Sequence, residues 1–433
     1  MTPQSNFMLL APIAAEHLAR LRDLLASMKQ ANGLADPANA LIPFGAFDRL
    51  HLARFVILDD QTSEDLAAVG LPPRPFPVSL VFFGDIDGAP ETFLGDLCHH
   101  AGAGLRQIFA CCKGFDAEVD LLDWMRRHNQ QPAAAYVNCI GRTVRQIREE
   151  DALYKAVAGF VDARAAELAG QDQQRRRSML IGFVDAQRQA GKLSLSPPDA
   201  TPPAWRIRNL LNLVGVPVAL LVASPLLLVA LPFYLYLLRS RELADPEITP
   251  RPDPARIAML AATEDHDVTN PYLVMGSLKP GAFRRLNTIF LLWLLDYLAR
   301  HIYTGGNLGR VRTIHFARFV FLDGRRRMLF ISNYDGTLEA YMDDFVNKVG
   351  WGLNVMFSNG VGYPRTEWIL QGGAKQEQNF KYYVRRHQMP TAVWYKAYPG
   401  LTVFDLARNT LLREGLERGH MTDAEIAEWL ALL

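Results

Sequence analysis

The sequence predicts an α+β protein that contains two copies of one βαββαβ unit, with a hydrophobic segment between them. The prediction rests on an internal repeat, on the same order of strand and helix patterns in both copies, and on a long stretch without charged side chains. The 433 residues are 49% hydrophobic and 21% charged, as in a globular chain. The 46 basic and 45 acidic side chains nearly cancel, which argues against a nucleic-acid partner.

The internal repeat is clearest at residues 50–59, LHLARFVILD, and 314–323, IHFARFVFLD, which are identical at seven of ten positions. An Asp-Gly pair follows in both copies, at 87–88 and 335–336, and a glutamate comes three residues after each glycine. Matches that recur in the same order indicate a duplication. An Arg-Arg-His triplet also recurs, at 126–128 and 385–387.

Each copy shows the same order of secondary-structure patterns. A short apolar strand leads into a long helix, two β-branched and aromatic runs follow, and a second helix begins after the Asp-Gly pair. A last strand precedes a further helix, which gives the βαββαβ order of a ferredoxin-like unit. In the first copy the predicted strands are 7–13, 51–58, 78–83 and 133–139, and the first helix is 14–31. In the second copy the predicted strands are 272–278, 315–322, 328–332 and 391–398, and the first helix is 281–303.

The domain organisation follows from the repeat. Helices cover only one face of a ferredoxin-like sheet, so the other face has to be covered, and two copies in one chain can cover each other. The predicted segments are repeat 1 at 1–165, a polar and basic linker at 166–205, a hydrophobic hairpin at 206–241, a linker at 242–266, repeat 2 at 267–418 and a C-terminal helix at 419–433.

The hydrophobic segment at 210–238 carries no charge and has arginines on both sides. Such a length is typical of a transmembrane helix, but a single crossing would separate the two repeats across the bilayer. Pro217, Pro225 and Pro232 each interrupt or kink a helix. We therefore predict a bent hairpin that enters one leaflet of the membrane, with a buried core helix, an oligomer interface or a single span as alternatives. Residues 289–295 are apolar on all sides, so repeat 2 is predicted to lie nearer the lipid.

The ends and the cysteines of the chain suggest a cytoplasmic protein. Residues 1–6 carry no Lys or Arg and the apolar run that follows is short, so no secretory signal is expected. Together with the hairpin, this places the protein on the cytoplasmic face of a membrane. Cys98, Cys111, Cys112 and Cys139 form no CxxC spacing, so we expect buried thiols and no metal site.

Two further patterns have structural explanations. His128 and His387 end predicted helices, where a cation favours the helix dipole. Several glycines resemble a phosphate-binding loop, but they lie within or after the second helix rather than between a strand and a helix, which argues against a nucleotide site. They are Gly102, Gly104, Gly350, Gly352, Gly360 and Gly362.

One histidine, one arginine and one aspartate recur in both copies and form the candidate site. The histidine and arginine are three residues apart on a strand, so they point to opposite faces of the sheet. A buried arginine needs an anionic partner, for which the aspartate of the neighbouring strand is the candidate. Two interpretations stay open: a ligand cavity between the sheets, and a duplicated structural ion pair whose aspartate caps a helix. The six candidate catalytic residues are His51, Arg54, Asp87, His315, Arg318 and Asp335.

The tandem units and one short motif resemble the dimeric α+β barrel superfamily, which includes dye-decolourising peroxidases and chlorite dismutases. The motif is Gly84-Asp85-Ile86-Asp87-Gly88, which fits the GxxDG of dye-decolourising peroxidases, and its second copy at 332–336 lacks the first glycine. The likeness extends over about 1–160 and 267–418. It implies an intramolecular α+β barrel, haem as a cofactor, and an aspartate on the distal side of the haem.

The leading functional hypothesis is a membrane-associated oxidoreductase, peroxidase- or oxygenase-like, that acts on a hydrophobic lipid-like substrate. A cofactor-free monooxygenase is also consistent with the superfamily. The alternatives are a non-catalytic lipid- or isoprenoid-binding protein and a scaffold that docks a membrane protein partner. The expected partners are therefore membrane lipid, a hydrophobic small molecule and a membrane protein, and much of this rests on analogy of fold.

Overall fold

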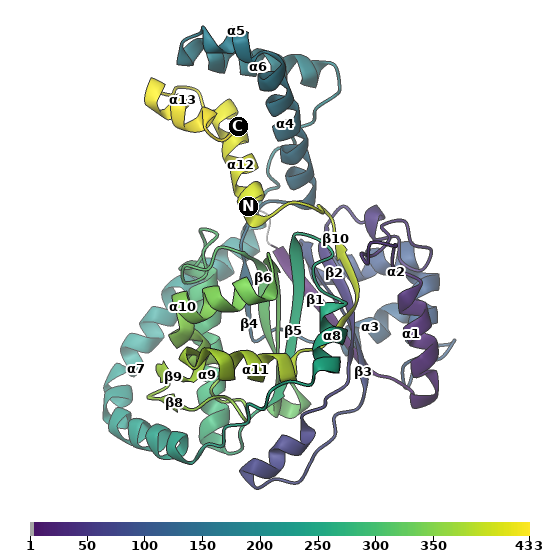
Figure 1. Ribbon diagram of the computed structural model, residues 1–433, viewed down its shortest axis with the longest axis vertical. Helices are drawn as coiled ribbons and strands as arrows, with labels where there is room; N and C mark the ends of the chain where they lie inside the picture. Colours follow the sequence, from purple (N-terminus) through teal and green to yellow (C-terminus); the bar gives the residue numbers. More distant parts are fainter. Residues whose placement is uncertain (1–3) are drawn as a thin grey trace.

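Two four-stranded antiparallel sheets lie at the centre of the protein (Figure 1). The computed structural model describes residues 4–433. The first sheet has the order β1 (Gln4–Pro12), β3 (Ser79–Asp87), β2 (Leu50–Leu58) and β10 (Thr391–Lys396). The second has the order β4 (Ala134–Val137), β6 (Ile314–Leu322), β7 (Arg327–Asp335) and β5 (Thr269–Ser277), and β8 (Thr366–Glu367) pairs with β9 (Gln371–Gly372) in a small hairpin.

Each repeat gives its last strand to the sheet of the other repeat. The strand β4 pairs with β6, with Ala134 opposite Phe319, and β10 pairs with β2, with Trp394 opposite Arg54. Both segments are strands as predicted, but neither lies beside its own repeat, so the order differs from that of a ferredoxin-like sheet. Over the described residues the strands form two open sheets rather than one closed barrel.

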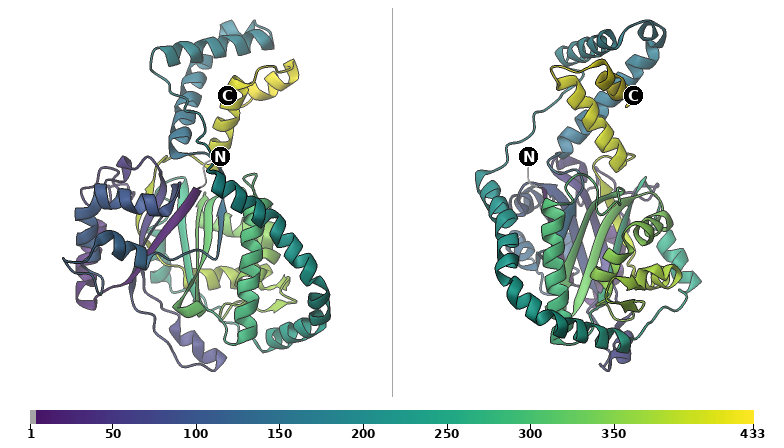
Figure 2. Two further views of the ribbon diagram at one scale, coloured as in Figure 1. Left: turned by 180° about the vertical axis from the view of Figure 1, so that it is seen from behind. Right: turned by 90° about the vertical axis from the view of Figure 1, so that its left-hand side faces the viewer.

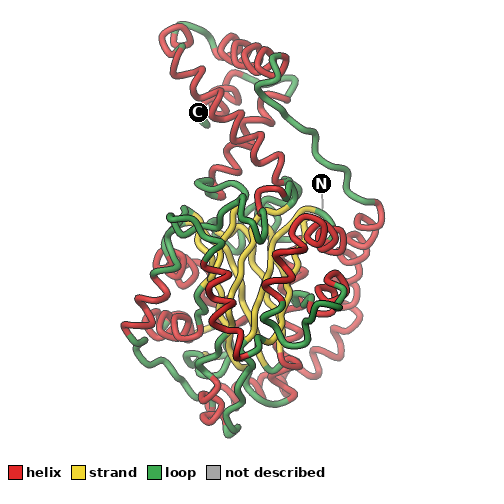
Figure 3. The backbone as a smooth tube through the Cα atoms, turned by 90° about the vertical axis from the view of Figure 1, so that its right-hand side faces the viewer, coloured by secondary structure: helices red, strands yellow, loops and turns green. Residues whose placement is uncertain are grey.

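The two sheets pack face to face, and helices cover their outer faces (Figure 3). Because side chains alternate along a strand, Phe7 and Leu9 of β1 join the helix-facing core while Met8 joins the core between the sheets. The first sheet is covered by α1 (Leu18–Ala26), α2 (Pro90–Phe109) and α3 (Leu121–His128), and the second by α9 (Ala282–His301), α10 (Leu338–Phe357) and α11 (Glu377–His387). Short helices lie at η1 (Ala15–His17), η2 (Phe44–Ala46), η3 (Ser63–Val69), η4 (Asp323–Arg325), η5 (Gly373–Lys375) and α8 (Pro254–Ala261).

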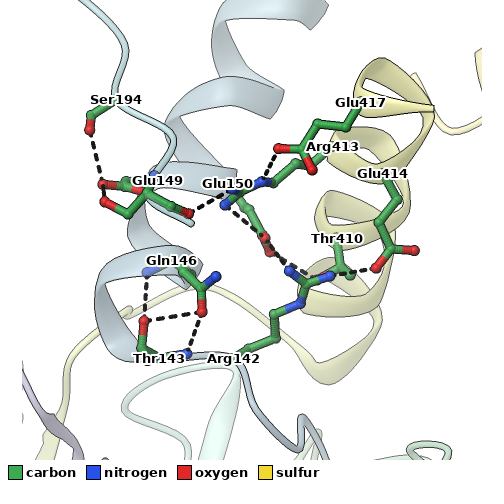
Figure 4. A network of polar contacts seen from close by, with 11 residues as sticks. Arg142, Thr143, Gln146, Glu149, Glu150, Ser194, Thr410, Arg413, Glu414 and Glu417 are labelled. Carbon is green, nitrogen blue, oxygen red and sulfur yellow. Dashed lines mark hydrogen bonds and ion pairs between the residues drawn. The ribbon is translucent and has the colours of Figure 1, made fainter. Parts of the chain in front are cut away.

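A helical arm projects from one end of the sheets (Figure 1). It consists of α4 (Val144–Ala163), α5 (Ala165–Ala169), α6 (Gln173–Gln189), α12 (Val403–Glu417) and α13 (Asp423–Leu430). The helices α4 and α12 follow the two exchanged strands, and buried Glu150 of α4 joins them (Figure 4). Its carboxylate accepts hydrogen bonds from Arg142 at 3.1 Å and from Thr410 of α12 at 2.8 Å. The predicted C-terminal helix is α13, which opens with a capping box at Thr422.

The hydrophobic segment is one helix, α7 (Pro203–Ala244), and not a hairpin. Pro217, Pro225 and Pro232 lie inside it, so the predicted break at Pro225 is wrong. Each proline removes one hydrogen bond and kinks the helix. Spacings of eight and seven residues place the three within roughly 80° of one another around the axis, so the kinks add up to a bend. Figure 2 shows the result, a bowed helix that passes along one side of the body and turns beneath it.

Candidate functional site

The bowed helix α7 presents a long apolar surface to solvent. Leu221, Val222 and Val229 in its middle are 73%, 76% and 80% exposed. Among the described residues, α7 is the one helix that could cross a membrane by length and composition. Because these side chains are exposed, the alternative prediction of a buried core helix is wrong. A contiguous apolar surface of this kind marks a site of contact with lipid or protein.

Both ends of α7 are held by the same helix, α9. Near its start, Asn209 accepts a hydrogen bond from Arg300 at 2.8 Å, and near its end Tyr234 donates to Asn287 at 3.0 Å. These contacts are about 38 Å apart along α7 but about 20 Å apart along α9, at 1.5 Å per residue, so the middle of α7 has to bow outward. Helix α9 is itself attached to the second sheet, because Asp296 of α9 accepts a hydrogen bond from the backbone of β4. Both ends of α7 therefore lie against the body of the protein, and a single crossing of the membrane does not fit these contacts.

An apolar cavity of about 160 Å³ lies between α9, α10 and the second sheet. A kink in α10 at Val349, where φ is −141°, separates the two helices at this point. Gly309 lies against the same valine, and a Cβ there would be 2.7 Å from Val349 Cγ1, so a larger residue would not fit. The cavity is lined by Leu291, Leu298, Tyr303, Phe319, Trp351 and Phe357, among others.

The first His–Asp pair anchors the helix that follows the exchanged strand. Asp87 Oδ1 accepts a hydrogen bond from His51 Nε2 at 3.0 Å, and its Oδ2 accepts one from the backbone N–H of Val144, the first residue of α4, at 2.9 Å. On the other side of the ring, His51 Nδ1 lies 3.2 Å from the hydroxyl of Tyr398. A carboxylate at a helix N-terminus is stabilised by the dipole and by the free N–H groups.

The second pair repeats this geometry at α12. Asp335 Oδ1 accepts hydrogen bonds from His315 Nε2 and Thr269 Oγ1, both at 2.7 Å, and Oδ2 accepts from the backbone N–H of Val403 at 2.6 Å. Burial lowers the pKa of His315, although the charge of Asp335 opposes the shift. We therefore assign a neutral ring that donates through Nε2. The contacts favour the interpretation of a duplicated structural pair, and catalytic roles for these residues stay predictions.

The arginines lie between the sheets and do not pair with these aspartates. Arg318 binds Asp85, and Arg54 donates to the carbonyl oxygens of Tyr272 at 3.1 Å and Ser332 at 2.7 Å. The predicted partnership of the arginines with Asp87 or Asp335 is therefore wrong. Burial lowers the pKa of Arg54 to about 9.

The sequence analysis missed the role of Asp85 as the arginine partner. Asp85 occupies the position that Asn333 has in the second copy, and Asn333 accepts a hydrogen bond from Arg54. Each arginine thus reaches the opposite sheet at an equivalent position. The signal was present in the aligned pairs Gly84-Asp85 and Ser332-Asn333, where the first copy has a charged residue at the position at which the second copy has an amide.

Of the predicted residues, Asp87 lines a surface cavity of about 890 Å³. The cavity is also lined by Thr143, which caps α4, and by Trp205 and Arg208 from the first turns of α7. Asp87 is only 5% exposed, and both of its carboxylate oxygens are engaged, one by His51 and one by the backbone N–H of Val144. This arrangement brings one candidate residue next to the apolar helix.

The histidines do not fit the haem that the family resemblance implies. Haem iron takes an axial ligand atom that has no other partner and faces the cofactor. His51 has both ring nitrogens engaged and is fully buried. His315 Nε2 is engaged by Asp335, and although its Nδ1 has no hydrogen-bond partner among the described residues, the ring is fully buried and has no face open to a cofactor. Within residues 4–433, no group of three or more His, Cys, Asp or Glu side chains is placed to hold a metal ion.

The remaining predicted positions have structural roles. His387 donates through Nδ1 to the carbonyl of Tyr383 at 2.9 Å, and burial lowers its pKa to about 4, so the neutral ring caps α11 while Arg385 and Arg386 supply the cations of its last turn. His128 makes the same bond to the carbonyl of Trp124 at 2.8 Å. The four cysteines, all within the described part of the chain, are free, and Cys111 and Cys112 are buried.

No family model, no curated protein and no solved structure matches this chain. The class that the fold and the surface define is therefore an α+β protein with two open antiparallel sheets and one long, exposed apolar helix.

Proposed function

We propose that this protein works at a membrane surface, where α7 lies in one leaflet and the protein binds a lipid-like amphiphile. The single observation that supports this proposal most strongly is the bowed helix. Its middle exposes Leu221, Val222 and Val229, while hydrogen bonds hold both ends against the body. A helix that is apolar, exposed and tied down at both ends is suited to lie in the interface rather than to cross it.

The size of the apolar surface supports membrane binding of useful strength. Full burial of one leucine or valine side chain contributes about 1.5–3 kcal/mol. The three most exposed side chains of α7 together therefore contribute roughly 3–6 kcal/mol when lipid covers them. Trp205 near its start and Tyr236 near its end are aromatic residues of the kind enriched at membrane–water interfaces.

The apolar cavity beside α9 supports binding of a lipid-like molecule rather than membrane attachment alone. Its volume of about 160 Å³ is close to that of engineered apolar cavities that hold a small apolar ligand. It lies behind the helix that holds α7, and Trp351 at its rim is half exposed. This supports the non-catalytic alternative of the sequence analysis, a lipid-binding protein on the membrane surface.

A second candidate function is a cofactor-free oxidoreductase of the α+β barrel superfamily. The observation that favours it is the cavity of about 890 Å³, which is lined by Asp87 of the GxxDG motif and borders Trp205 of α7. In this proposal Asp87, paired with His51, is the acid or base that faces the substrate. The face-to-face sheets support the family resemblance, and the exchanged strands depart from it.

Flotation with phosphatidylcholine vesicles tests the membrane-surface function. The full-length protein is expected to float with the vesicles. The triple variant Leu221→Asn, Val222→Asn and Val229→Asn is expected to partition more than about 100-fold more weakly, because it loses about 3 kcal/mol or more of apolar transfer energy.

The matched control is a triple variant at three exposed apolar residues away from α7, Val268→Asn, Phe404→Asn and Leu411→Asn. It is expected to float like the unchanged protein. Equal flotation of the α7 variant and the unchanged protein would refute the proposed role of α7. Mass spectrometry of the detergent-purified protein then identifies the lipid-like ligand.

A further inference from the structure

A cavity of about 470 Å³ near the end of α7 has six cationic residues in its lining, beside a larger set of mostly apolar ones. It lies where the first turn of α9, the end of β5 and the turn between β6 and β7 meet. Asp323 is the acidic residue among its lining residues. The cations are Arg74, Lys279, Arg285, Arg325, Arg326 and Arg327.

Some of these cations are already neutralised. Arg327 is buried and binds Asp60, and Lys279 is buried and lies 2.8 Å from Asp245. By contrast, Arg285 and Arg325 are exposed, and neither forms an ion pair with any carboxylate in the described part of the chain. The cavity therefore carries an excess of positive charge that its own carboxylates do not balance.

Uncharged donors at the same place point to a ligand with several acceptor oxygens. Gly281, the residue before α9, provides no side-chain cap, so within residues 4–433 the first N–H groups of this 20-residue helix lack a side-chain acceptor. The φ of Gly281 is 102°, a conformation that favours glycine and leaves this end of the helix uncovered. Ser277, which also lines the cavity, is 3% exposed, and its hydroxyl has no hydrogen-bond partner among the described residues.

The first turn of α9, which lines the cavity, also packs against the end of α7. Arg241, near the end of α7, lies 5.5 Å over the ring of Phe283 in the first turn of α9, and Tyr234 packs against the same ring at 5.5 Å. One turn further along α9, Leu286 is 64% exposed. Cationic donors and exposed apolar side chains are therefore neighbours, as an anionic amphiphile requires.

We propose that this cavity binds the phosphate group of an anionic phospholipid whose acyl chains lie along α7 and α9. The chemistry is that of a phosphate ester, held by the guanidinium groups of Arg285 and Arg325, the N-terminal N–H groups of α9 and the hydroxyl of Ser277. The inference rests on the proposed membrane-surface function and adds the class of lipid that is recognised.

Flotation with two vesicle compositions tests the site, one of phosphatidylcholine alone and one of phosphatidylcholine with phosphatidic acid. The unchanged protein is expected to prefer the second. The double variant Arg285→Gln and Arg325→Gln is expected to bind those vesicles about 30-fold more weakly, because it loses two charges near the lipid surface, and to bind pure phosphatidylcholine as before. The matched control, Arg22→Gln and Lys113→Gln, removes two exposed charges on the first repeat and is expected to keep the preference.

The outcomes separate the site from the function on which it rests. Failure of the unchanged protein to bind either vesicle overturns the membrane-surface function. Binding to both with a preference that survives in the Arg285→Gln and Arg325→Gln variant overturns the phosphate site alone. A third arm measures inorganic phosphate without vesicles: a thermal shift that the double variant lacks, without any vesicle preference, supports the phosphate site and assigns it to a soluble ligand.

Discussion

Asp335→Asn is expected to destabilise the protein because it removes the anchor of α12. The Asp335 carboxylate accepts three hydrogen bonds, from His315 at 2.7 Å, from Thr269 at 2.7 Å and from the backbone N–H of Val403 at 2.6 Å. An asparagine side chain has one acceptor oxygen and one NH₂ donor, so at least one of the three donors faces another donor. Hydrogen bonds to a charged acceptor contribute about 1.5–3 kcal/mol each, so the free energy of unfolding is expected to fall by about 2–5 kcal/mol.

Urea unfolding of the detergent-purified protein, followed by tryptophan fluorescence, measures this loss at neutral pH. The control is Asp344→Asn, which breaks only a partly exposed pair with Lys348 at 2.8 Å on α10. A pair of this kind contributes less than about 0.5 kcal/mol. The first copy provides an internal comparison: the Asp87 carboxylate accepts two hydrogen bonds rather than three, from His51 and from the backbone N–H of Val144, so Asp87→Asn is expected to cost less.

An Asp335→Asn variant that unfolds at the same urea concentration as the unchanged protein would refute the structural role. The refutation would be specific, because the three donors meet a side chain that is only 9% exposed, so little water can reach them to replace the lost hydrogen bonds. The catalytic interpretation of the duplicated pairs would then be the one that remains.

Two further predictions concern positions that the sequence patterns singled out. Gly104→Ala is expected to lower the free energy of unfolding by about 1–3 kcal/mol or more, because its Cβ would lie 1.9 Å from the carbonyl oxygen of Leu41. Gly102→Ala, which makes only ordinary contacts on the same helix, is expected to raise the free energy of unfolding by up to about 1 kcal/mol. Equal thermal stability of the two variants would contradict the packing argument. Burial lowers the pKa of His387 from 6.5 to about 4, so between these pH values the unfolded chain binds a proton that the folded chain does not. The free energy of unfolding is therefore expected to fall by about 3 kcal/mol as the pH drops from 6.5 toward 4. The variant His387→Gln is expected to flatten this pH dependence, and the control His420→Gln, at an exposed position, is expected to leave it unchanged.

The strands could be predicted from the sequence, but their partners could not. The apolar runs at 133–139 and 391–398 are strands, as the pattern indicates. Because the two repeats are homologous, β4 finds at β6 nearly the same surface that β2 offers in its own copy. Trp394 opposite Arg54 and Ala135 opposite Arg318 are equivalent positions. A pattern of alternation specifies a face and a length, and it does not distinguish between two similar edges.

The connection between the repeats was predicted correctly in hydrophobicity and wrongly in shape. Prolines are strong signals against a straight helix, but each removes only one hydrogen bond, so a bent helix keeps far more of its backbone hydrogen bonds than a broken one. The contacts that hold its ends, Arg300 with Asn209 and Tyr234 with Asn287, involve residues of another helix far along the chain. Local sequence contains no information about them.

The proposed membrane-binding surface lies where the two copies differ rather than where they are identical. The recurring His–Asp pairs explain how two helices of the arm begin, which a duplicated fold needs twice. By contrast, α1 exposes Arg20 and Arg22, whereas α9, its counterpart, exposes Leu286 and Phe290. That change gives α7 a helix to lie against and leaves an apolar cavity behind it in the second repeat. Since a structural duplication preserves what both copies require, the exposed apolar residues that differ between the copies are the ones on which the proposed membrane binding is expected to depend.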